Sequence, residues 1–202
     1  MLTTKSNFWK WALPLIALSV ALDQFVKAIV LNTPVFHARE CLEPGATMRC
    51  GKIEMSSLLD WSMIWNYGVS YGLFQSDGIG RWILLLVSLG ISVAFIAWIF
   101  KAERARTVLA LALVVGGAIG NMIDRARFGA VVDYIDMSGP WFGITFPAES
   151  GLTRMLDARF FHADGVLGLG FPYVYNIADM SITFGAILLF ADQLLAERAE
   201  KG

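Results

Sequence analysis

Apolar residues fill four long stretches of the chain, and polar residues gather mainly between them. The stretches cover about residues 11–31, 82–100, 107–123 and 176–195. Each approaches the roughly 20 residues that a helix needs to cross the hydrocarbon core of a bilayer. The pattern therefore predicts four transmembrane helices, in a single membrane domain that covers residues 1–202.

Two longer connections, about residues 32–81 and 125–174, separate the helices. Apolar and aromatic residues at 53–71, bounded by glycine-rich turns, predict a small sheet in the first connection. In the second, apolar residues at 152–160 recur at helical spacing, opposite charged residues. This short helix either lies flat on the bilayer or packs on the rest of the loop region.

The composition agrees with a membrane protein. Hydrophobic residues make up 56% of the chain and charged residues 16%, whereas a soluble domain carries about 25% charged residues. The 16 basic and 17 acidic side chains nearly cancel. The chain therefore has no excess of positive charge to indicate nucleic acid as a partner.

Basic residues flank the predicted helices on one side of the membrane. Lys5 and Lys10 precede the first helix, residues 101–106 form a basic turn between the second and third, and Arg198 and Lys201 follow the fourth. Because short basic flanks stay in the cytoplasm, we expect both termini inside and both long connections outside. The predicted fold is an all-α membrane protein of four transmembrane helices, with a small extracytoplasmic β subdomain and an extended second outside loop.

The first apolar stretch also has features of a cleaved signal peptide. Ser19-Val-Ala21 offers small residues at a cleavage position. However, the stretch continues beyond Asp23 to Leu31 and reaches spanning length. An uncleaved helix is therefore the favoured interpretation.

Both cysteines of the chain, Cys41 and Cys50, lie in the first outside connection. Two neighbouring thiols in an oxidising compartment can form a disulfide. Zinc binding is the alternative, but a structural zinc site needs four ligands, and the connection holds one histidine, His37. We expect no metal site.

Four aspartates lie at or just beyond the helix ends that face outside: Asp23, Asp124, Asp133 and Asp179. Acids in a membrane are functional candidates because their burial is costly, although each of these could simply mark the end of a span. The spacing Asn-x-x-Asp occurs at 121–124 and at 176–179, and on a helix it places an amide and a carboxylate on one face. Together with Arg125, these groups are suited to bind a peptide.

Other polar residues receive structural interpretations. Asp23 either supports this site or pairs with Lys27, one turn later. Solvated or interfacial positions are expected for Asp136 and Asp192. Loop or surface positions are expected for Asp60, Asp77, His37 and His162.

The sequence lacks the motifs of several enzyme classes. It has no His-Glu-x-x-His zinc motif, phosphate-binding loop or dinucleotide fingerprint. Residues 68–72 match the Gly-x-Ser-x-Gly motif of serine hydrolases, but the chain is too short for the parallel sheet that this motif requires. A pair of carboxylates can hydrolyse a peptide without a cofactor, because one stays protonated while the other activates water. The sequence positions alone leave Asp124 and Asp133 as rivals for such a pair.

Two other classes of function compete with a peptidase. A proton-coupled transporter would use the acids as a relay, but such proteins tend to have internal repeats and acids near the midplane, which this sequence lacks. An assembly factor would use Gly116 and Gly120, whose spacing allows close helix approach. It would also tolerate substitution of the aspartates.

Four sequence blocks occur in order along nearly the whole chain. They are Asp23-Gln-x-x-Lys27; Asn66-x-Gly68-x-Ser-Tyr-Gly72; Gly116-Gly-Ala-x-Gly-Asn121-x-x-Asp124-Arg125 with Gly129-x-Val-Val-Asp133; and Tyr175-Asn176-x-Ala178-Asp179-x-x-Ile182. In these blocks the chain resembles the lipoprotein signal peptidases (signal peptidase II), a family of bacterial membrane aspartic peptidases.

The resemblance implies a function and a set of site residues. Asp133 and Asp179 would form the catalytic pair. The supporting or substrate-binding residues would be Asp23, Lys27, Asn66, Gly68, Asn121, Asp124, Arg125, Asn176 and Ala178. The substrate would be a prolipoprotein whose lipobox cysteine carries diacylglycerol, cut on the amino side of that cysteine. The resemblance further implies a multi-pass protein of the bacterial inner membrane that contacts lipid and is inhibited by globomycin; we expect it to act as a monomer without a cofactor.

The sequence also departs from the family pattern. The first outside connection is enlarged around the cysteines, and the stretch between Asp133 and Asp179 is longer than usual. Tyr175 stands where phenylalanine is common. We hypothesise that residues 140–172 form a lid or a substrate-contacting flap beside the catalytic pair.

Overall fold

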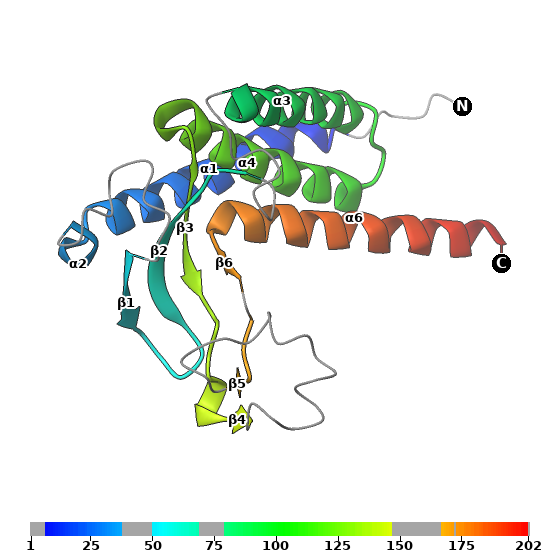
Figure 1. Cartoon of the computed structure of the whole chain (residues 1–202). Helices are drawn as coiled ribbons and strands as arrows, with labels where there is room; N and C mark the ends of the chain where they lie inside the picture. The colour runs from blue at the N-terminus through cyan, green and yellow to red at the C-terminus, as the bar shows by residue number, and fades with distance from the viewer. Residues whose placement is uncertain (1–6, 38–49, 69–78, 147–166, 172, 202) are drawn as a thin grey trace, which may run out of the picture. The chain divides into compact units, whose positions relative to one another are not determined.

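Four long helices dominate the structure, a computed structural model that describes residues 7–37, 50–68, 79–146, 167–171 and 173–201. These residues form two compact units, each built from separate parts of the chain. The first unit contains the helix α1 (Trp9–Leu31) as far as Ala28, together with α3 (Ile79–Ile99), α4 (Ala105–Phe128) and α6 (Ile177–Lys201) (Figure 1). All four are long and apolar enough to cross a membrane, which confirms the predicted number of spans.

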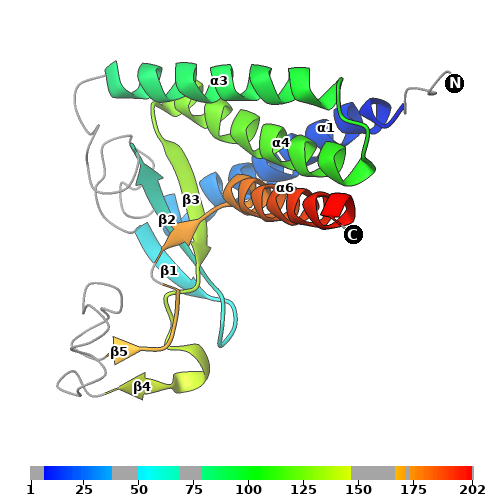
Figure 2. The ribbon, with the colours of Figure 1, turned by 90° about the vertical axis from the view of Figure 1, so that its right-hand side faces the viewer.

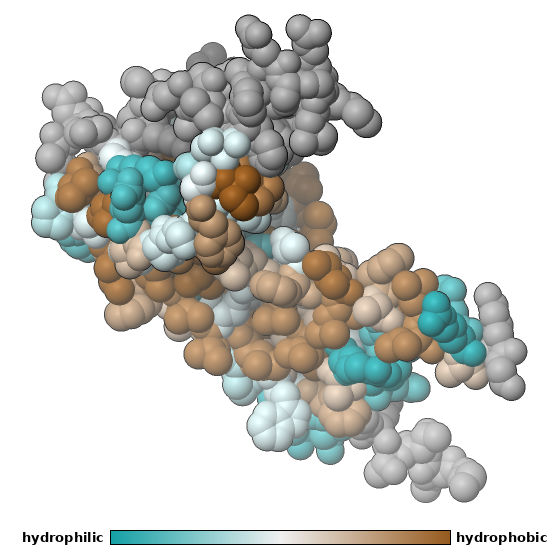
Figure 3. Space-filling model, turned by 90° about the horizontal axis from the view of Figure 1, so that it is seen from below, coloured by the Kyte–Doolittle hydropathy of each residue, from teal (hydrophilic) through white to brown (hydrophobic). Residues whose placement is uncertain are grey.

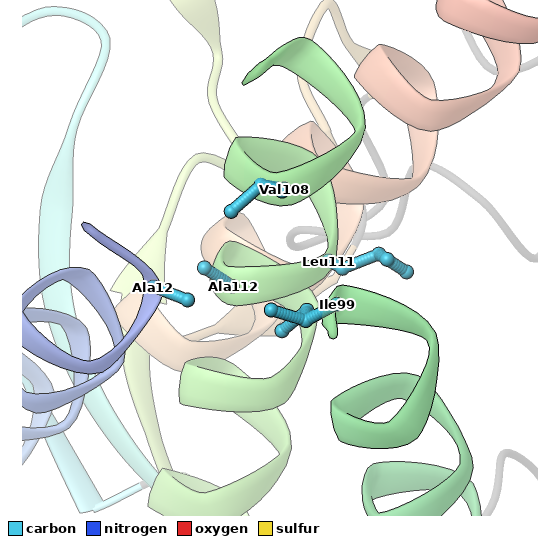
Figure 4. Close-up of a cluster of buried hydrophobic side chains, with 5 residues drawn as sticks. All are labelled: Ala12, Ile99, Val108, Leu111 and Ala112. Carbon is cyan, nitrogen blue, oxygen red and sulfur yellow. The ribbon is translucent and has the colours of Figure 1, made fainter. Parts of the chain in front are cut away.

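Helix α4 is the central helix of this unit. Both α3 and α6 pack against it, and Figures 1 and 2 show α4 between them. Where α1, α3 and α4 meet, a buried apolar cluster forms from Ala12, Ile99, Val108, Leu111 and Ala112 (Figure 4). The other helices keep many apolar side chains exposed, and such side chains cover much of the described surface in Figure 3. Exposed apolar residues around a long helix are typical of a surface that faces lipid.

Glycines allow α4 to approach its neighbours closely. A Cβ on Gly116 would lie 2.7 Å from the Ser19 side chain in α1. A Cβ on Gly117 would overlap the backbone of Ala178 in α6. Gly120 faces α1 at a similarly short distance. The close approach predicted from Gly116 and Gly120 is therefore confirmed, and Gly117 extends it to a second helix.

The second unit is built around a four-stranded antiparallel sheet. Its strands are β1 (Cys50–Glu54), β2 (Asp60–Asn66), β3 (Val131–Asp136) and β6 (Val174–Tyr175), in the order β1-β2-β3-β6. In the pairing of β1 with β2, Ile53 lies opposite Trp61, and in that of β3 with β6, Ile135 lies opposite Tyr175. The sheet predicted at 53–71 is confirmed, with β1 beginning slightly earlier. The strands β3 and β6 were not expected from the sequence.

Shorter elements complete the second unit. The helix α2 (Pro34–His37) contacts β1. After β3 come a 3-10 turn (Trp141–Gly143) and the strands β4 (Thr145–Phe146) and β5 (Leu167–Gly168), which pair antiparallel. The four membrane helices together with the small sheet confirm the predicted fold class.

Several predictions lie outside the described residues. They concern the short helix at 152–160, the disulfide of Cys41 with Cys50, the acid Asp77, the histidine His162 and most of the Gly68–Gly72 motif. The side chain of His37 lies outside them as well.

Candidate active site

Asp179 lies in the first turn of α6, and its side chain is half-buried. The side-chain amide of Asn121, on α4, donates a hydrogen bond from Nδ2 to Asp179 Oδ1 over 2.8 Å. Asn121 itself is buried. Because a buried amide needs partners for both its nitrogen and its oxygen, its orientation depends on the group that its oxygen meets.

Lys27 of α1 supplies that group. Its Nζ donates to Asn121 Oδ1 over 3.2 Å, so the amide nitrogen is directed at Asp179. The Lys27 side chain is 2% exposed, and its Nζ lies 2.8 Å from Asp23 Oδ2 and 2.7 Å from Asp124 Oδ2. One buried ammonium therefore holds two carboxylates and the amide that contacts Asp179.

Asp23 also contacts the start of α6. Its Oδ1 accepts a hydrogen bond from the Ala178 backbone N–H over 3.0 Å. The first N–H groups of a helix have no intrahelical partner, and negative charge is favourable beside them. Asp23 thus ties α1 to the residue before Asp179, in addition to its pairing with Lys27.

Gln24 is a polar neighbour that the sequence analysis did not single out. Its Nε2 lies 2.9 Å from Asp124 Oδ1 and 3.2 Å from Asp23 Oδ2. It also donates to the Gly120 carbonyl over 3.2 Å. The spacing contained a signal, since Gln24 and Lys27 are three residues apart on α1 and therefore neighbours on its surface.

In the second unit, Asp133 lies on β3 and is 3% exposed. Asn176, a fully buried residue that follows β6, donates from Nδ2 to Asp133 Oδ1 over 2.7 Å and to the Val132 carbonyl over 3.2 Å. The predicted sharing of one helix face by Asn176 and Asp179 is wrong, because α6 begins at Ile177. The amide is instead directed at a neighbouring strand of the sheet.

Beside Asn176, Tyr175 donates a hydrogen bond from its hydroxyl to Met137 Sδ over 2.7 Å. Burial raises the pKa of the Tyr175 hydroxyl above its usual value. The side chain therefore stays protonated and remains a donor at neutral pH.

Asn66, Gly68 and Arg125 complete the set of predicted site residues. Asn66 ends β2, and its Oδ1 accepts the backbone N–H of Gly68 over 3.2 Å. Arg125 lies in the last turn of α4, where positive charge is favourable. The first unit brings together the predicted residues Asp23, Lys27, Asn121, Asp124, Ala178 and Asp179, and the second brings together Asp133 and Asn176.

The prediction of a solvated or interfacial position for Asp192 is wrong. This residue of α6 is 1% exposed, and its Oδ2 accepts a hydrogen bond from Thr107 Oγ1 over 2.5 Å. The Nε atoms of Arg104 and Arg106 each lie 3.3 Å from the carboxylate. Arg104 and Arg106, at the start of α4, therefore contact α6 well beyond its first turns, a contact between segments distant in the sequence.

The expectations for Asp136 and Asp60 are wrong too. Asp136 is fully buried at the end of β3, where it accepts hydrogen bonds from Ser62 Oγ over 2.6 Å and from the Ser138 N–H over 2.9 Å. Asp60 is the first residue of β2 rather than a loop residue, and its Oδ2 lies 2.7 Å from Lys52 Nζ. Both acids gain these partners when β2 pairs with its neighbouring strands.

The described part of the chain holds no group of three or more His, Cys, Asp and Glu side chains placed to bind a metal ion. Its fold and its polar clusters define a multi-pass membrane protein in which buried amides contact carboxylates. This construction is suited to acid–base chemistry by aspartates.

Comparisons with known proteins agree with that class. The family model for signal peptidase (SPase) II matches residues 15–195. The lipoprotein signal peptidase of Caulobacter vibrioides is 34% identical over 90% of this chain and 84% of its own length. That of Sphingopyxis alaskensis is 32% identical over 96% of this chain and 91% of its own length. A solved bacterial membrane enzyme has a similar fold, with a TM-score of 0.63 and 23% identity over 96% of this chain and 92% of that chain.

The chain belongs to the signal peptidase II family of aspartic peptidases. The match confirms the resemblance identified from the sequence and the predicted activity, the cleavage of signal peptides from prolipoproteins. It also confirms a multi-pass protein of a bacterial membrane.

Proposed function

We propose that Asp133 and Asp179 form the catalytic pair of this peptidase. The observation that carries the proposal is that each carboxylate accepts a hydrogen bond from a buried asparagine amide, from Asn176 over 2.7 Å and from Asn121 over 2.8 Å respectively. Three peptide units join Asn176 to Asp179, and they span at most about 11 Å. The chain therefore keeps the Cα atom of Asp179 within about 11 Å of the Cα atom of Asn176, whose amide binds Asp133.

The contacts of Asp124 favour Asp133 as the partner of Asp179. Asp124 is 1% exposed, lies 2.7 Å from the Lys27 ammonium and accepts a hydrogen bond from Gln24. A carboxylate held in this way serves as a counter-ion for a buried lysine. Its release to carry protons would leave that lysine charge partly uncompensated.

In the proposed reaction, the ionised aspartate of the pair takes a proton from a water molecule as its oxygen attacks the scissile carbonyl carbon. The protonated aspartate donates its proton to the carbonyl oxygen. When the tetrahedral intermediate collapses, the C–N bond breaks and the leaving amine takes the proton that the first aspartate holds. The second aspartate regains its proton from the hydroxyl of the intermediate, so both groups return to their starting states.

The substrate in this proposal is a prolipoprotein whose lipobox cysteine already carries diacylglycerol, cleaved on the amino side of that cysteine by a monomeric enzyme. A lipid-anchored scissile bond lies at the membrane surface, where the ends of the helices also lie. Basic flanks at both termini and at residues 101–106 support cytoplasmic termini and a site on the outer face. Two reporters fused to the C-terminus test this orientation. A reporter that functions in the cytoplasm should be active, and activity of a reporter that requires export would contradict cytoplasmic termini.

The catalytic pair can be tested with isosteric variants in purified, reconstituted protein. Asp133→Asn and Asp179→Asn should each abolish cleavage of a diacylglyceryl-modified lipobox peptide, while the variants still fold and insert. Asp60→Asn is the matched control, because Asp60 pairs with a half-exposed lysine on the sheet; it should keep wild-type turnover. Globomycin should inhibit the wild-type protein. Near wild-type turnover by either of the first two variants would disprove the assignment.

A further inference from the structure

Residues 137–146 and 167–175 contain no charged side chain, although acidic residues flank them in the chain. Five of their apolar side chains are exposed: Phe142 (67%), Ile144 (42%), Leu169 (39%), Phe171 (45%) and Tyr173 (44%). We call these five side chains, three aromatic and two aliphatic, the aromatic platform. An uncharged surface that exposes this much apolar area marks an interaction site.

Backbone hydrogen bonds hold the two segments of the platform together. The Trp141 N–H donates to the Leu169 carbonyl over 2.7 Å, and the Leu169 N–H donates to the Ile144 carbonyl over 3.0 Å. The Phe171 N–H donates to the Met137 carbonyl over 2.7 Å. The platform is therefore preorganised, and a partner would not have to order it on binding.

Phe142 has an unusual backbone conformation, and its backbone N–H donates to the Ser57 carbonyl over 3.3 Å. Its φ is 54°, in the left-handed region that costs an L-residue other than glycine about 1–2 kcal/mol. Phe142 is also the most exposed residue of the platform, so the described residues give its ring little packing. Strained residues of this kind cluster at functional and ligand-contact sites, and the exposed ring of Phe142 is available for such a contact.

We propose that the aromatic platform lies in the interface of the bilayer, at the boundary between the lipid head groups and the acyl chains. Strand β6 continues directly into the membrane helix α6 (Figure 1). Tyr173 lies four residues before Ile177, the first residue of α6, a stretch that spans at most about 14 Å. The covalent chain thus keeps part of the platform near the point where α6 enters the bilayer.

The side-chain chemistry selects lipid over a charged partner. Tyrosine is enriched at the membrane interface, where its hydroxyl faces water while its ring contacts lipid; this describes Tyr173. The phenylalanine, isoleucine and leucine side chains beside it have no polar group to pair with a charged partner. The rings of Phe171 and Tyr173 have centroids 5.7 Å apart, as do those of Phe171 and Tyr175. The Phe171 ring therefore contacts both tyrosine rings. The inference requires only that the chain spans a membrane, and it does not depend on the proposed catalytic pair.

The experiment measures depth in the bilayer with a spin label on the full chain. In a background with Cys41→Ser and Cys50→Ser, labels are attached at Phe142→Cys and, separately, at Tyr173→Cys, and the proteins are reconstituted in phosphatidylcholine vesicles. The matched control is Glu54→Cys, an exposed charged position on β1 of the same unit. Collisions of each label with oxygen, which partitions into lipid, are compared with collisions with a water-soluble nickel chelate.

We expect the labels at 142 and 173 to show a ratio of oxygen to nickel collisions several-fold higher than the label at 54, as for groups buried about 5–10 Å into the boundary between head groups and acyl chains. Equal ratios at all three positions would overturn the proposal. Labels at 142 and 173 that collide with nickel in empty vesicles, but become protected when a lipobox peptide is added, would also overturn it, in favour of a substrate contact. Retained peptide cleavage by each labelled protein shows that it is folded, independently of the depth measurement.

Discussion

Lys27→Met should lower both the stability and the turnover of the protein. The loss of stability should be larger than for Lys52→Met, the matching change at the other lysine with an ion pair among the described residues. Methionine has a similar length but no charge, so the variant leaves Asp23 and Asp124 buried without the ammonium that now lies 2.8 and 2.7 Å from their oxygens. It also removes the donor to Asn121 Oδ1. Because Asn121 in turn contacts Asp179, stability and turnover should fall together.

The magnitude follows from the distances. At 2.7–2.8 Å and an effective dielectric constant of about 20, each pair has a Coulomb attraction of about 6 kcal/mol. Desolvation of the buried charges offsets much of this attraction, and breaking a buried pair typically costs about 3–5 kcal/mol. We expect Lys27→Met to lower the free energy of unfolding by that amount.

Lys52 provides a control with the same bond length and less burial. Its Nζ lies 2.7 Å from Asp60 Oδ2, but its side chain is 40% exposed. Solvent screens such a pair, so Lys52→Met should lower the free energy of unfolding by about 1 kcal/mol or less. The comparison isolates the effect of burial on an ion pair.

The assay is reversible unfolding of the purified protein in mixed detergent micelles, for each variant and for Asp124→Asn and the double variant Lys27→Met/Asp124→Asn. If the ion pair carries the effect, the double variant should lose clearly less stability than the sum of the two single losses. The reasoning is refuted if Lys27→Met costs no more than Lys52→Met, or if the two single losses are simply additive.

Two further substitutions test the packing of α6 on α4. Gly117→Ala should separate the helices beside Asp179, because the added Cβ overlaps the Ala178 backbone; we expect a cost of about 1–3 kcal/mol and a large loss of turnover. The control is Gly90→Ala in α3, where nothing lies within 4 Å of the added Cβ; alanine is the better helix former, so this change should not lower stability and should leave peptide cleavage unchanged. Asp192→Ala removes the carboxylate shared by Arg104 and Arg106 and should lower the melting temperature by the equivalent of about 1–3 kcal/mol, with a smaller effect on cleavage because the change is far along α6 from Asp179; unchanged melting would show that the carboxylate does not hold the helix end.

Hydropathy was sufficient to predict the four helices, because long apolar runs have few other stable structures in a membrane protein. It did not give their full length. Helix α4 continues from the predicted end at residue 123 to Phe128, through polar residues that an apolar pattern does not include. The strands β3 and β6 also lay beyond prediction, since β6 has two residues and pairs with a segment distant in the sequence.

The polar clusters show the same limit. The spacing of Asn121 and Asp124 correctly placed both on one face of α4, where they contact the same ammonium of Lys27. The identical spacing of Asn176 and Asp179 did not have that meaning, because Asn176 precedes α6. Periodicity predicts which residues share a face, but only the helix boundaries decide whether the rule applies.

The contacts of α6 explain how a membrane helix can hold one carboxylate in a fixed position. Near its start, Ala178 lies so close to Gly117 of α4 that a single Cβ would not fit. Further along, a Cβ on Gly185 would lie 2.7 Å from the Ala110 carbonyl, and beyond it Asp192 pairs with Arg104 and Arg106 at the start of α4. A sliding or turning motion of α6 would bring side chains into the close contacts and separate the ion pairs. The buried charges around Lys27 and around Asp192 therefore restrict the register of α6. They also restrict the position of the Asp179 carboxylate near the start of that helix.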